Sequence, residues 1–241
     1  MNSMGTPRSY VIGDIHGCPE EVDRLLDHLS PAAADTIVFL GDYIDRGPGS
    51  KAVVERLLRL RQEGPHCIFL KGNHEDMFLA FIGRGGQYGE SFLYNGGGAT
   101  LKSYGVERVP AHDIPQHLPA GHLAFLESLE MQHPMGEFLC VHAGVNPRRP
   151  LHDQDREDLL WIRGAFIQNP HPFPVTVVFG HTPCREVMFD LPYKIGLDTG
   201  LVYSNNLSCI ELSEKQLFQI RRGEREVVTT SVRHRFDAVK R

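Results

Sequence analysis

The chain has 241 residues, of which 41% are hydrophobic, and a formal net charge of −5 at pH 7, which suits one enzyme-sized domain. Its five cysteines, an odd number without regular spacing, argue against a disulfide framework and for a reducing compartment. Because no apolar run approaches the roughly 20 residues that span a bilayer and the amino terminus lacks an apolar signal core, we expect a cytoplasmic protein without a membrane partner.

Five short apolar runs have the composition of strands that are buried on both faces. In chain order they are residues 10–12, 36–40, 68–70, 139–141 and 175–179. Apolar residues at helical spacing follow the first two runs, at Val22, Leu25, Leu26 and Leu29 and then at Val53, Val54, Leu57 and Leu58. This β-α-β-α-β order predicts an α/β fold, in which ligands collect at the carboxyl ends of the strands.

A polar side chain follows each of these runs, at Asp14, Asp42, Asn73, His142 and His181. Their shared position at strand ends predicts that they converge on one edge of a sheet. The set offers oxygen and imidazole ligands and no cysteine thiolate. Such a set favours Mn²⁺, Fe or Zn²⁺ over metals that prefer thiolate ligands. Cys18 and Cys140 lie next to these positions and are interpreted as packing residues.

The spacing of these side chains suits two ions. Asp14 and His16, two residues apart on one turn, can hold one ion, whereas Asn73, His142 and His181 can hold a second. Asp42 is the expected bridge, because a carboxylate can give one oxygen to each of two ions about 3.5–4 Å apart.

Residues 83–134 interrupt the strand pattern, and we interpret them as a cap insertion within a single domain, 1–241, that could select substrates. The glycine-rich part, residues 83–98, lacks the Lys-Ser/Thr end of a P-loop and predicts a mobile loop beside the site. A short helix is predicted further on by four apolar residues, Leu123, Phe125, Leu126 and Leu129.

The last third of the chain changes pattern. Alternating runs at 208–212 and 216–220 predict antiparallel strands, which we expect in a second sheet packed on the first. Residues 221–241 are rich in arginine but interleaved with acidic residues. They predict solvated strand ends and a frayed tail rather than a nucleic-acid-binding arm.

Four motifs carry a family resemblance: Gly-Asp-Ile-His-Gly at 13–17, Gly-Asp-Tyr-Ile-Asp-Arg-Gly at 41–47, Gly-Asn-His-Glu at 72–75, and the later histidines in His142-Ala143-Gly144 and Gly180-His181-Thr182. In this order they resemble the calcineurin-like metallophosphoesterase superfamily, specifically the phosphoprotein phosphatase branch in its compact bacterial and phage form. The match covers about residues 10–199. The resemblance implies two mixed β-sheets packed as a central sandwich and flanked by helices, with a dimetal site at strand carboxyl ends.

The resemblance also implies roles for individual residues. Asp14, His16 and Asp42 match the ligands of a first metal, and Asp42, Asn73, His142 and His181 match those of a second. We expect Mn²⁺, with Fe or Zn²⁺ as alternatives. His74 and Asp45 match the catalytic acid pair. A hydroxide that bridges the metals would attack phosphorus in line, and His74 would protonate the leaving oxygen.

Two arginines offer planar donor forks that fit phosphate oxygens. Arg46 directly follows Asp45, and we expect Arg163 to be the second half of a phosphate clamp, although it could instead pair with Asp155 or Asp158. Asp198 and Thr199 either support the site from behind the ligands or form a turn at a strand end.

These features predict a metal-dependent phosphatase for phosphomonoesters, with phosphoserine and phosphothreonine in proteins as the substrate that the resemblance implies. Glu75 after His74 favours this choice by resemblance. The alternative is a symmetrical dinucleoside tetraphosphate hydrolase, since the sequence from Asp45 to Ser50 also occurs in that group. A second alternative, a non-catalytic scaffold, is disfavoured because none of the expected ligands is missing. The expected partner is a phosphorylated protein or a small phosphoester.

Overall fold

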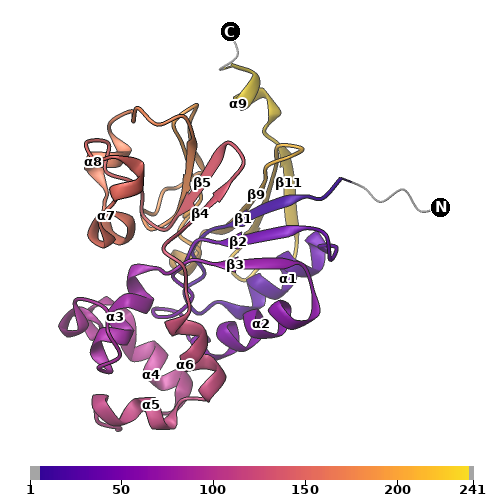
Figure 1. Ribbon diagram of the computed structural model, residues 1–241. Coiled ribbons are helices and arrows are strands. Elements are labelled where there is room, and N and C mark those ends of the chain that lie inside the picture. Colours follow the sequence, from indigo (N-terminus) through magenta and orange to yellow (C-terminus); the bar gives the residue numbers. More distant parts are fainter. Residues whose placement is uncertain (1–5, 239–241) are drawn as a thin grey trace.

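Two β-sheets packed face to face make up the centre of the structure, and helices cover their outer faces (Figure 1). The computed structural model describes residues 6–238. In pairing order, the strands of the first sheet are β11 (Val227–Ser231), β10 (Gln216–Arg221), β9 (Asn206–Glu211), β1 (Ser9–Ile12), β2 (Thr36–Phe39) and β3 (His66–Phe69). Those of the second are β4 (Gln132–Met135), β5 (Phe138–Val141), β6 (Thr176–Phe179), β8 (Lys194–Gly196) and β7 (Met188–Asp190). The fold class implied by the resemblance is confirmed.

The strands send alternate side chains into different cores, as the twofold period of a strand requires. In β1, Val11 lies in the core between the two sheets, together with Val178 of β6. Tyr10 and Ile12 lie in the core between the first sheet and its helices. Because both faces of β1 are covered, its three buried residues are hydrophobic, which explains the apolar run at 10–12. Each large side chain buried in this way stabilises the fold by about 1.5–3 kcal/mol.

The helices complete a four-layer arrangement. Leu25 of one helix and Val53 of another pack on the outer face of the first sheet, whereas Leu159 and Phe166 pack on that of the second. In chain order the helices are α1 (Pro19–Leu29), α2 (Ser50–Glu63), α3 (Asn73–Phe81), α4 (Gly98–Tyr104), α5 (Ile114–His117), α6 (Ala120–Glu127), α7 (Arg156–Trp161), α8 (Gly164–Ile167) and α9 (Arg233–Asp237). Among the helices described here, none has both the length and the apolar character needed to cross a bilayer.

The prediction that the two alternating runs near the carboxyl terminus form the second sheet is wrong. β9 pairs antiparallel with β1, placing Tyr10 opposite Glu211, and β10 and β11 extend the same sheet. The reason is that β2 pairs with only one edge of β1, and the backbone groups of the other edge also need partners. The prediction of a frayed tail at residues 221–241 is also wrong, because β11 and α9 lie within this range. Residues 239–241 of that tail lie outside the described residues.

The segment 83–134 lies below the first sheet in the view of Figure 1 and is mostly helical. Its predicted short helix is α6. The glycine-rich part contains two helical turns, η1 (Gly89–Ser91) and η2 (Leu93–Gly97), where the sequence predicted a loop. α4 contacts α2, and α6 contacts α2 and α3, so the segment packs against the helices that follow β2 and β3.

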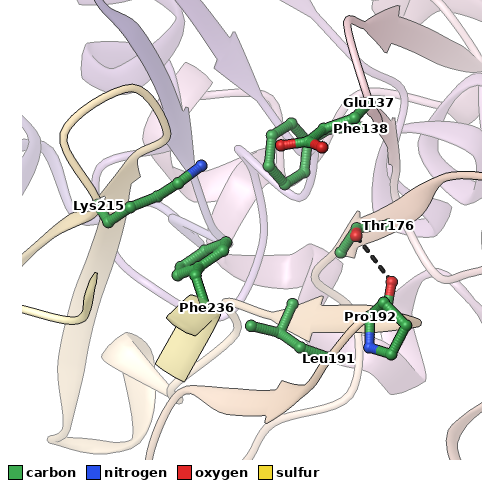
Figure 2. A pocket seen from close by; sticks show the side chains of 7 residues that line it. All are labelled: Glu137, Phe138, Thr176, Leu191, Pro192, Lys215 and Phe236. Carbon is green, nitrogen blue, oxygen red and sulfur yellow. Dashed lines mark hydrogen bonds between the residues drawn. The ribbon is translucent and has the colours of Figure 1, made fainter. Parts of the chain in front are cut away.

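The opposite end of the sandwich holds a pocket of about 190 Å³ at the amino ends of β5 and β6 (Figure 2). Phe236 of α9 lines it, and the Lys215 Nζ lies 4.4 Å from the centre of the Phe236 ring and 5.0 Å from that of Phe138. This packing places α9 over the amino ends of these strands. The predicted metal ligands follow the carboxyl ends.

Candidate metal centre

The side chains predicted to bind metal gather at the carboxyl ends of parallel strands from both sheets. Asp14 follows β1, Asp42 follows β2, Asn73 begins α3 after β3, and His142 and His181 follow β5 and β6. These five residues and His16 are at most 4% exposed. Strands far apart in sequence therefore bring ligand-type side chains into one buried place, which is the convergence that the sequence predicted.

The loops that carry these side chains turn in left-handed backbone conformations. His16, Asp42, Asp45, Arg46 and His181 have φ angles of 46°, 52°, 72°, 64° and 64°. This conformation costs an L residue roughly 1–2 kcal/mol. Strained residues of this kind cluster at functional sites, where the surrounding fold holds them in place.

Two glycines allow carboxylates to come close to the backbone. A Cβ atom on Gly72 would overlap with Oδ1 of Asp42, and one on Gly180 would overlap with Oδ1 of Asp14. Any larger residue at either position would displace a carboxylate. The space that the two carboxylates occupy explains why glycine precedes both Asn73 and His181.

His16, Asp42 and His74 form a first group, in which the candidate ligand atoms lie within 4.8 Å of one another. His16 Nδ1 lies 2.9 Å from the Ile44 carbonyl oxygen, and if it donates there, Nε2 keeps a lone pair. That Nε2 lies 3.4 Å from Asp42 Oδ2. Burial lowers the pKa of His16 to about 3, so the imidazole is neutral at pH 7. Two lone-pair atoms facing each other in this way fit a cation, and in this structure the Arg46 guanidinium donates to the Nε2 atom of His16.

Asp42, His142 and His181 form a second group. His142 Nδ1 lies 2.8 Å from the Leu40 carbonyl oxygen, and its Nε2 lies 3.4 Å from Asp42 Oδ1 and 3.0 Å from Asn73 Oδ1. His181 Nδ1 lies 2.9 Å from the same oxygen of Asn73. Its Nε2 is buried and has no hydrogen-bond partner among the described residues. Burial lowers the pKa of His181 to about 2, so this ring is also neutral and able to bind a metal.

Asp42 belongs to both groups, and its two carboxylate oxygens face different ones. Oδ2 faces His16, whereas Oδ1 faces His142. The rings of His16 and His181 beside this buried carboxylate are neutral, whereas the pKa of His74 is raised, so bound cations would add charge compensation that most of the imidazoles do not supply. The donor set therefore fits a pair of divalent cations, with one oxygen of Asp42 available to each.

Asp14 lies beside these groups but outside both sets of mutually close ligand atoms. Its two oxygens accept from the backbone N–H of His181 at 3.2 and 3.0 Å. Burial, and then the carboxylates of Asp198 and Asp42, raise the pKa of Asp14 well above its usual value. Asp198 Oδ1 also accepts from the Gly200 N–H at 2.9 Å. Asp198 therefore lies behind the ligands and also forms part of a turn, the two roles that the sequence left open. Buried carboxylates this close together also fit a cation among them.

His74 and Asp45 make a buried pair next to the first group. His74 Nδ1 and Asp45 Oδ2 are 2.7 Å apart, and the His74 Nε2 lies 4.0 Å from Asp42 Oδ2. Thr100 donates to the other oxygen of Asp45 at 2.5 Å, and the Asp45 N–H contacts both Thr100 and Ser50. Burial would lower the pKa of His74, but Asp42 and Asp45 outweigh it and raise that pKa. A histidine that keeps its proton near neutral pH can donate it to a leaving group.

One arginine lies beside each group. Arg46 Nη1 lies 2.5 Å from His16 Nε2. Arg163 Nη1 lies 3.5 Å from the hydroxyl of Thr182, the residue after His181. The alternative partners of Arg163 are engaged elsewhere, since Asp155 and Asp158 lie 2.7 and 3.9 Å from nitrogens of Arg149.

The carboxylate of Glu75 holds the loop that carries Asp42. Oε2 accepts from the N–H groups of Gly72 and Asp42, both at 2.9 Å. Oε1 accepts from those of Tyr43 and Ile44 at 2.8 and 3.2 Å. Burial, followed by the nearby Asp42, raises the pKa of Glu75 to about 8. Because all four donors are backbone amides, Glu75 fixes the position of Asp42 and does not face a substrate.

Sequence reasoning gave no positioning role to Glu75, Ser50 or Thr100. Glu75 could have been found, because a glutamate three residues after a helix N-cap has the capping-box spacing, and its Oε2 accepts from the N–H of the N-cap residue Gly72. Ser50 and Thr100 carry no such signal. Ser50 meets Asp45 across the turn before α2, and Thr100 meets it only after α4 has packed on α2. Thr199 donates to the Asn206 carbonyl at 2.7 Å and belongs to a turn.

Comparison with known proteins adds a family assignment. A family model described as calcineurin-like phosphoesterase matches residues 7–207. Bis(5'-nucleosyl)-tetraphosphatase PrpE [asymmetrical] of Bacillus thuringiensis (strain Al Hakam) is 25% identical over 236 residues, which cover 87% of this chain and 92% of the relative. The symmetrical bis(5'-nucleosyl)-tetraphosphatase of Dechloromonas aromatica is 32% identical over 141 residues, covering 58% of this chain and 45% of the relative.

Solved structures share the fold. A crystal structure provisionally described as a diadenosine tetraphosphatase has a TM-score of 0.69 at 24% identity and covers 91% of this chain and 95% of its own. A cold-active protein tyrosine phosphatase also has a TM-score of 0.69, at 17% identity, over 93% of this chain and 79% of its own. At these identities the likeness concerns the fold.

Replacement of Glu75 by glutamine tests whether this side chain positions Asp42. The amide nitrogen of glutamine cannot accept from two of the four backbone N–H groups, and each buried donor left without a partner costs about 1–3 kcal/mol. We expect Glu75→Gln to lower the free energy of unfolding by about 2–4 kcal/mol and to weaken metal binding at least about tenfold. Urea denaturation and calorimetric metal titration measure the two effects.

Glu211→Gln is the matched control. Glu211 is also buried and accepts from the backbone N–H groups of Ser213 and Glu214 at 2.9 and 2.6 Å, at the end of β9. We expect this variant to lose stability but to keep the metal affinity of the unmodified protein. If Glu75→Gln also keeps that affinity, Glu75 does not position Asp42.

Proposed function

The chain belongs to the calcineurin-like phosphoesterase family, and from this premise we propose that it cleaves dinucleoside tetraphosphates with the help of two divalent cations. The family makes the chain a phosphoesterase, an enzyme rather than the scaffold considered above. The observation that carries the substrate proposal is that Arg46 and Arg163 lie beside different ligand groups, on either side of Asp42. Two arginines beside different ligand groups can contact neighbouring phosphates of a polyphosphate chain.

We assign the ligands as the sequence implied, with Asp14, His16 and Asp42 for one cation and Asp42, Asn73, His142 and His181 for the other. His74 is close enough to the first group to bind metal, but its Nδ1 is taken by Asp45 and its raised pKa favours the protonated ring. A ligand must be deprotonated, so His74 is left free for proton transfer. When bound, a pair of divalent cations lowers the pKa of a water molecule and neutralises phosphate charge. Mn²⁺ fits this oxygen and imidazole set.

His74 acts as the general acid in this proposal. Asp45 holds Nδ1 and stabilises the charged ring, while Nε2 keeps the proton that a leaving phosphate oxygen would take. Thr100 and Ser50 hold Asp45 in turn, so the orientation of His74 depends on α2 and α4. Positioning of this kind lets the proton move without prior rearrangement.

The choice of substrate differs from the first expectation. Phosphoserine and phosphothreonine were favoured partly by Glu75, but all four of its hydrogen bonds join backbone amides, so its presence carries no information on the leaving group. Two curated relatives are named as dinucleoside tetraphosphatases, which supports the alternative. Hydrolysis of phosphoproteins stays a prediction that the comparisons do not test.

We further propose that the chain is a single metallophosphoesterase domain in which residues 83–134 act as the cap. Thr100 and the carbonyl of Gly96, both from this segment, contact Asp45 and Arg46. All five cysteines are free thiols, which supports a reducing, cytoplasmic location.

Two substitutions separate metal binding from proton donation. Asp42→Asn removes the shared carboxylate, and we expect it to lose bound metal and more than about 100-fold in kcat/KM. His74→Asn keeps the ligands, and we expect normal metal content with kcat lowered about 100- to 10,000-fold for poor leaving groups. Metal analysis and turnover of p-nitrophenyl phosphate and phenyl phosphate measure both.

Comparison of two esters with different leaving groups tests whether His74 is the general acid. The p-nitrophenolate ion leaves without help, so His74→Asn should slow phenyl phosphate much more than p-nitrophenyl phosphate. Equal losses on the two esters would contradict the acid role, and unchanged turnover in both variants would contradict the catalytic assignment as a whole.

A substrate panel tests the proposed reaction. Metal-stripped protein is restored with Mn²⁺, Zn²⁺, Fe²⁺ or Mg²⁺ separately and offered diadenosine tetraphosphate or peptides with phosphoserine or phosphothreonine. We expect a kcat/KM at least about tenfold higher for the dinucleotide, because both arginines then contact phosphate. The products, two ADP or ATP with AMP, identify the bond that is cut. A preference for the phosphopeptides would return the assignment to a protein phosphatase.

A further inference from the structure

Exposed apolar side chains concentrate around the candidate metal centre. Five large hydrophobic residues are exposed in the part of the chain that the structure describes. Tyr203 lies against Arg46, Leu93 and Tyr94 lie in the turn whose Gly96 carbonyl accepts from the Arg46 N–H, and Tyr88 packs on Trp161. Tyr94 is 95% exposed and Tyr203 is 59% exposed. Large apolar groups left in water at one place typically mark a binding surface. We call Tyr88, Tyr94, Trp161 and Tyr203 the aromatic rim.

Two members of the rim lie on the side of Arg46. The Arg46 guanidinium carbon is 5.6 Å from the centre of the Tyr203 ring. The Arg46 N–H donates to the Gly96 carbonyl at 3.1 Å, and Tyr94 lies two residues before Gly96 in η2. A Cβ atom on Gly96 would come within 2.9 Å of the Arg46 side chain, so this turn lies directly against it. Tyr203 and the turn that carries Tyr94 thus both lie against Arg46.

The other two members lie on the side of Arg163. The Trp161 ring is 6.0 Å from the His181 ring, and Arg163 follows two residues later. The Tyr88 ring meets Trp161 edge to face at 5.3 Å, and its hydroxyl donates to Glu157 at 3.0 Å. The indole N–H of Trp161 is buried without a hydrogen-bond partner among the described residues. Aromatic side chains therefore lie beside Arg46 near the first ligand group and beside His181 of the second.

We propose that the aromatic rim binds the nucleobases of a dinucleoside polyphosphate, with Tyr203 and Tyr94 under one base and Trp161 and Tyr88 under the other. The inference rests on the proposed function and adds that the substrate carries nucleobases as well as phosphates. The order aromatic, arginine, metal ligands, arginine, aromatic matches the order base, phosphates, base along such a molecule. Stacking suits every base, because each presents a π face, and three of the four rim rings, Tyr88, Tyr94 and Tyr203, are exposed while Trp161 is half-buried.

The test compares a substrate with bases to one without. Tyr203→Ala and Tyr94→Ala are assayed with diadenosine tetraphosphate and with inorganic tetraphosphate, which offers the same phosphoanhydride bonds. We expect each alanine variant to raise KM for the dinucleotide about 5- to 100-fold. Its kcat/KM for inorganic tetraphosphate should stay within about twofold of the unmodified protein. Tyr203→Phe, which keeps the ring, should behave like the unmodified protein on both.

Val228→Ala is the control, since Val228 is the remaining exposed large hydrophobic residue, on β11, and we expect it to change neither substrate. Equal losses on both substrates in Tyr203→Ala would overturn the inference, because the ring would then serve only to hold Arg46. Unchanged KM values for the dinucleotide in both alanine variants would overturn it as well.

Binding of ADP, compared with pyrophosphate by calorimetry, separates the two proposals. Suppose that the enzyme does not turn over the dinucleotide but binds ADP at least about tenfold more tightly than pyrophosphate, and that Tyr203→Ala abolishes this difference. The proposed function is then wrong, and base binding by the aromatic rim is supported. If the dinucleotide is turned over but ADP and pyrophosphate bind with equal affinity, base binding by the aromatic rim is refuted and the proposed function is supported.

Discussion

The carboxylate of Asp42 lies between two sets of buried histidines, and the arrangement of the rest of the site depends on it. An ionised carboxylate among neutral imidazoles is unfavourable in a dry interior unless positive charge accompanies it. His16 and His142 each have one ring nitrogen next to a backbone carbonyl oxygen, which directs the other toward Asp42. The same geometry fits two cations, with one oxygen of Asp42 available to each.

Several distant contacts keep this arrangement in place. Glu75 takes up four backbone amides around Asp42, and Gly72 leaves room for its carboxylate. The two sheets supply ligands from opposite sides, since Asp42 follows a strand of the first and His142 a strand of the second. The core between the sheets therefore sets the distance between the halves of the site. Residues 83–134 add Thr100 behind Asp45, so the acid pair relies on a segment outside the sandwich.

The sequence was most informative where chemistry and local pattern coincide. Unbroken apolar runs located β1, β2, β5 and β6, and the polar residue after each run marked the carboxyl edge. The sequence was not sufficient to predict which strands pair with one another. The alternating pattern of β9 and β10 fits either sheet, and only the free edge of β1 decides. Tyr203 and Trp161 were missed because aromatic residues carry no ligand signature, and their meaning depends on where Arg46 and His181 finally lie.

Magnetic coupling between bound ions tests the central claim most directly. Metal-stripped protein is titrated with Mn²⁺ while its electron paramagnetic resonance spectrum is recorded. A carboxylate shared between two ions about 3.5–4 Å apart predicts two ions per chain and a spin-coupled spectrum at saturation. Saturation by a single ion, or two ions with the spectra of isolated Mn²⁺, would contradict the account.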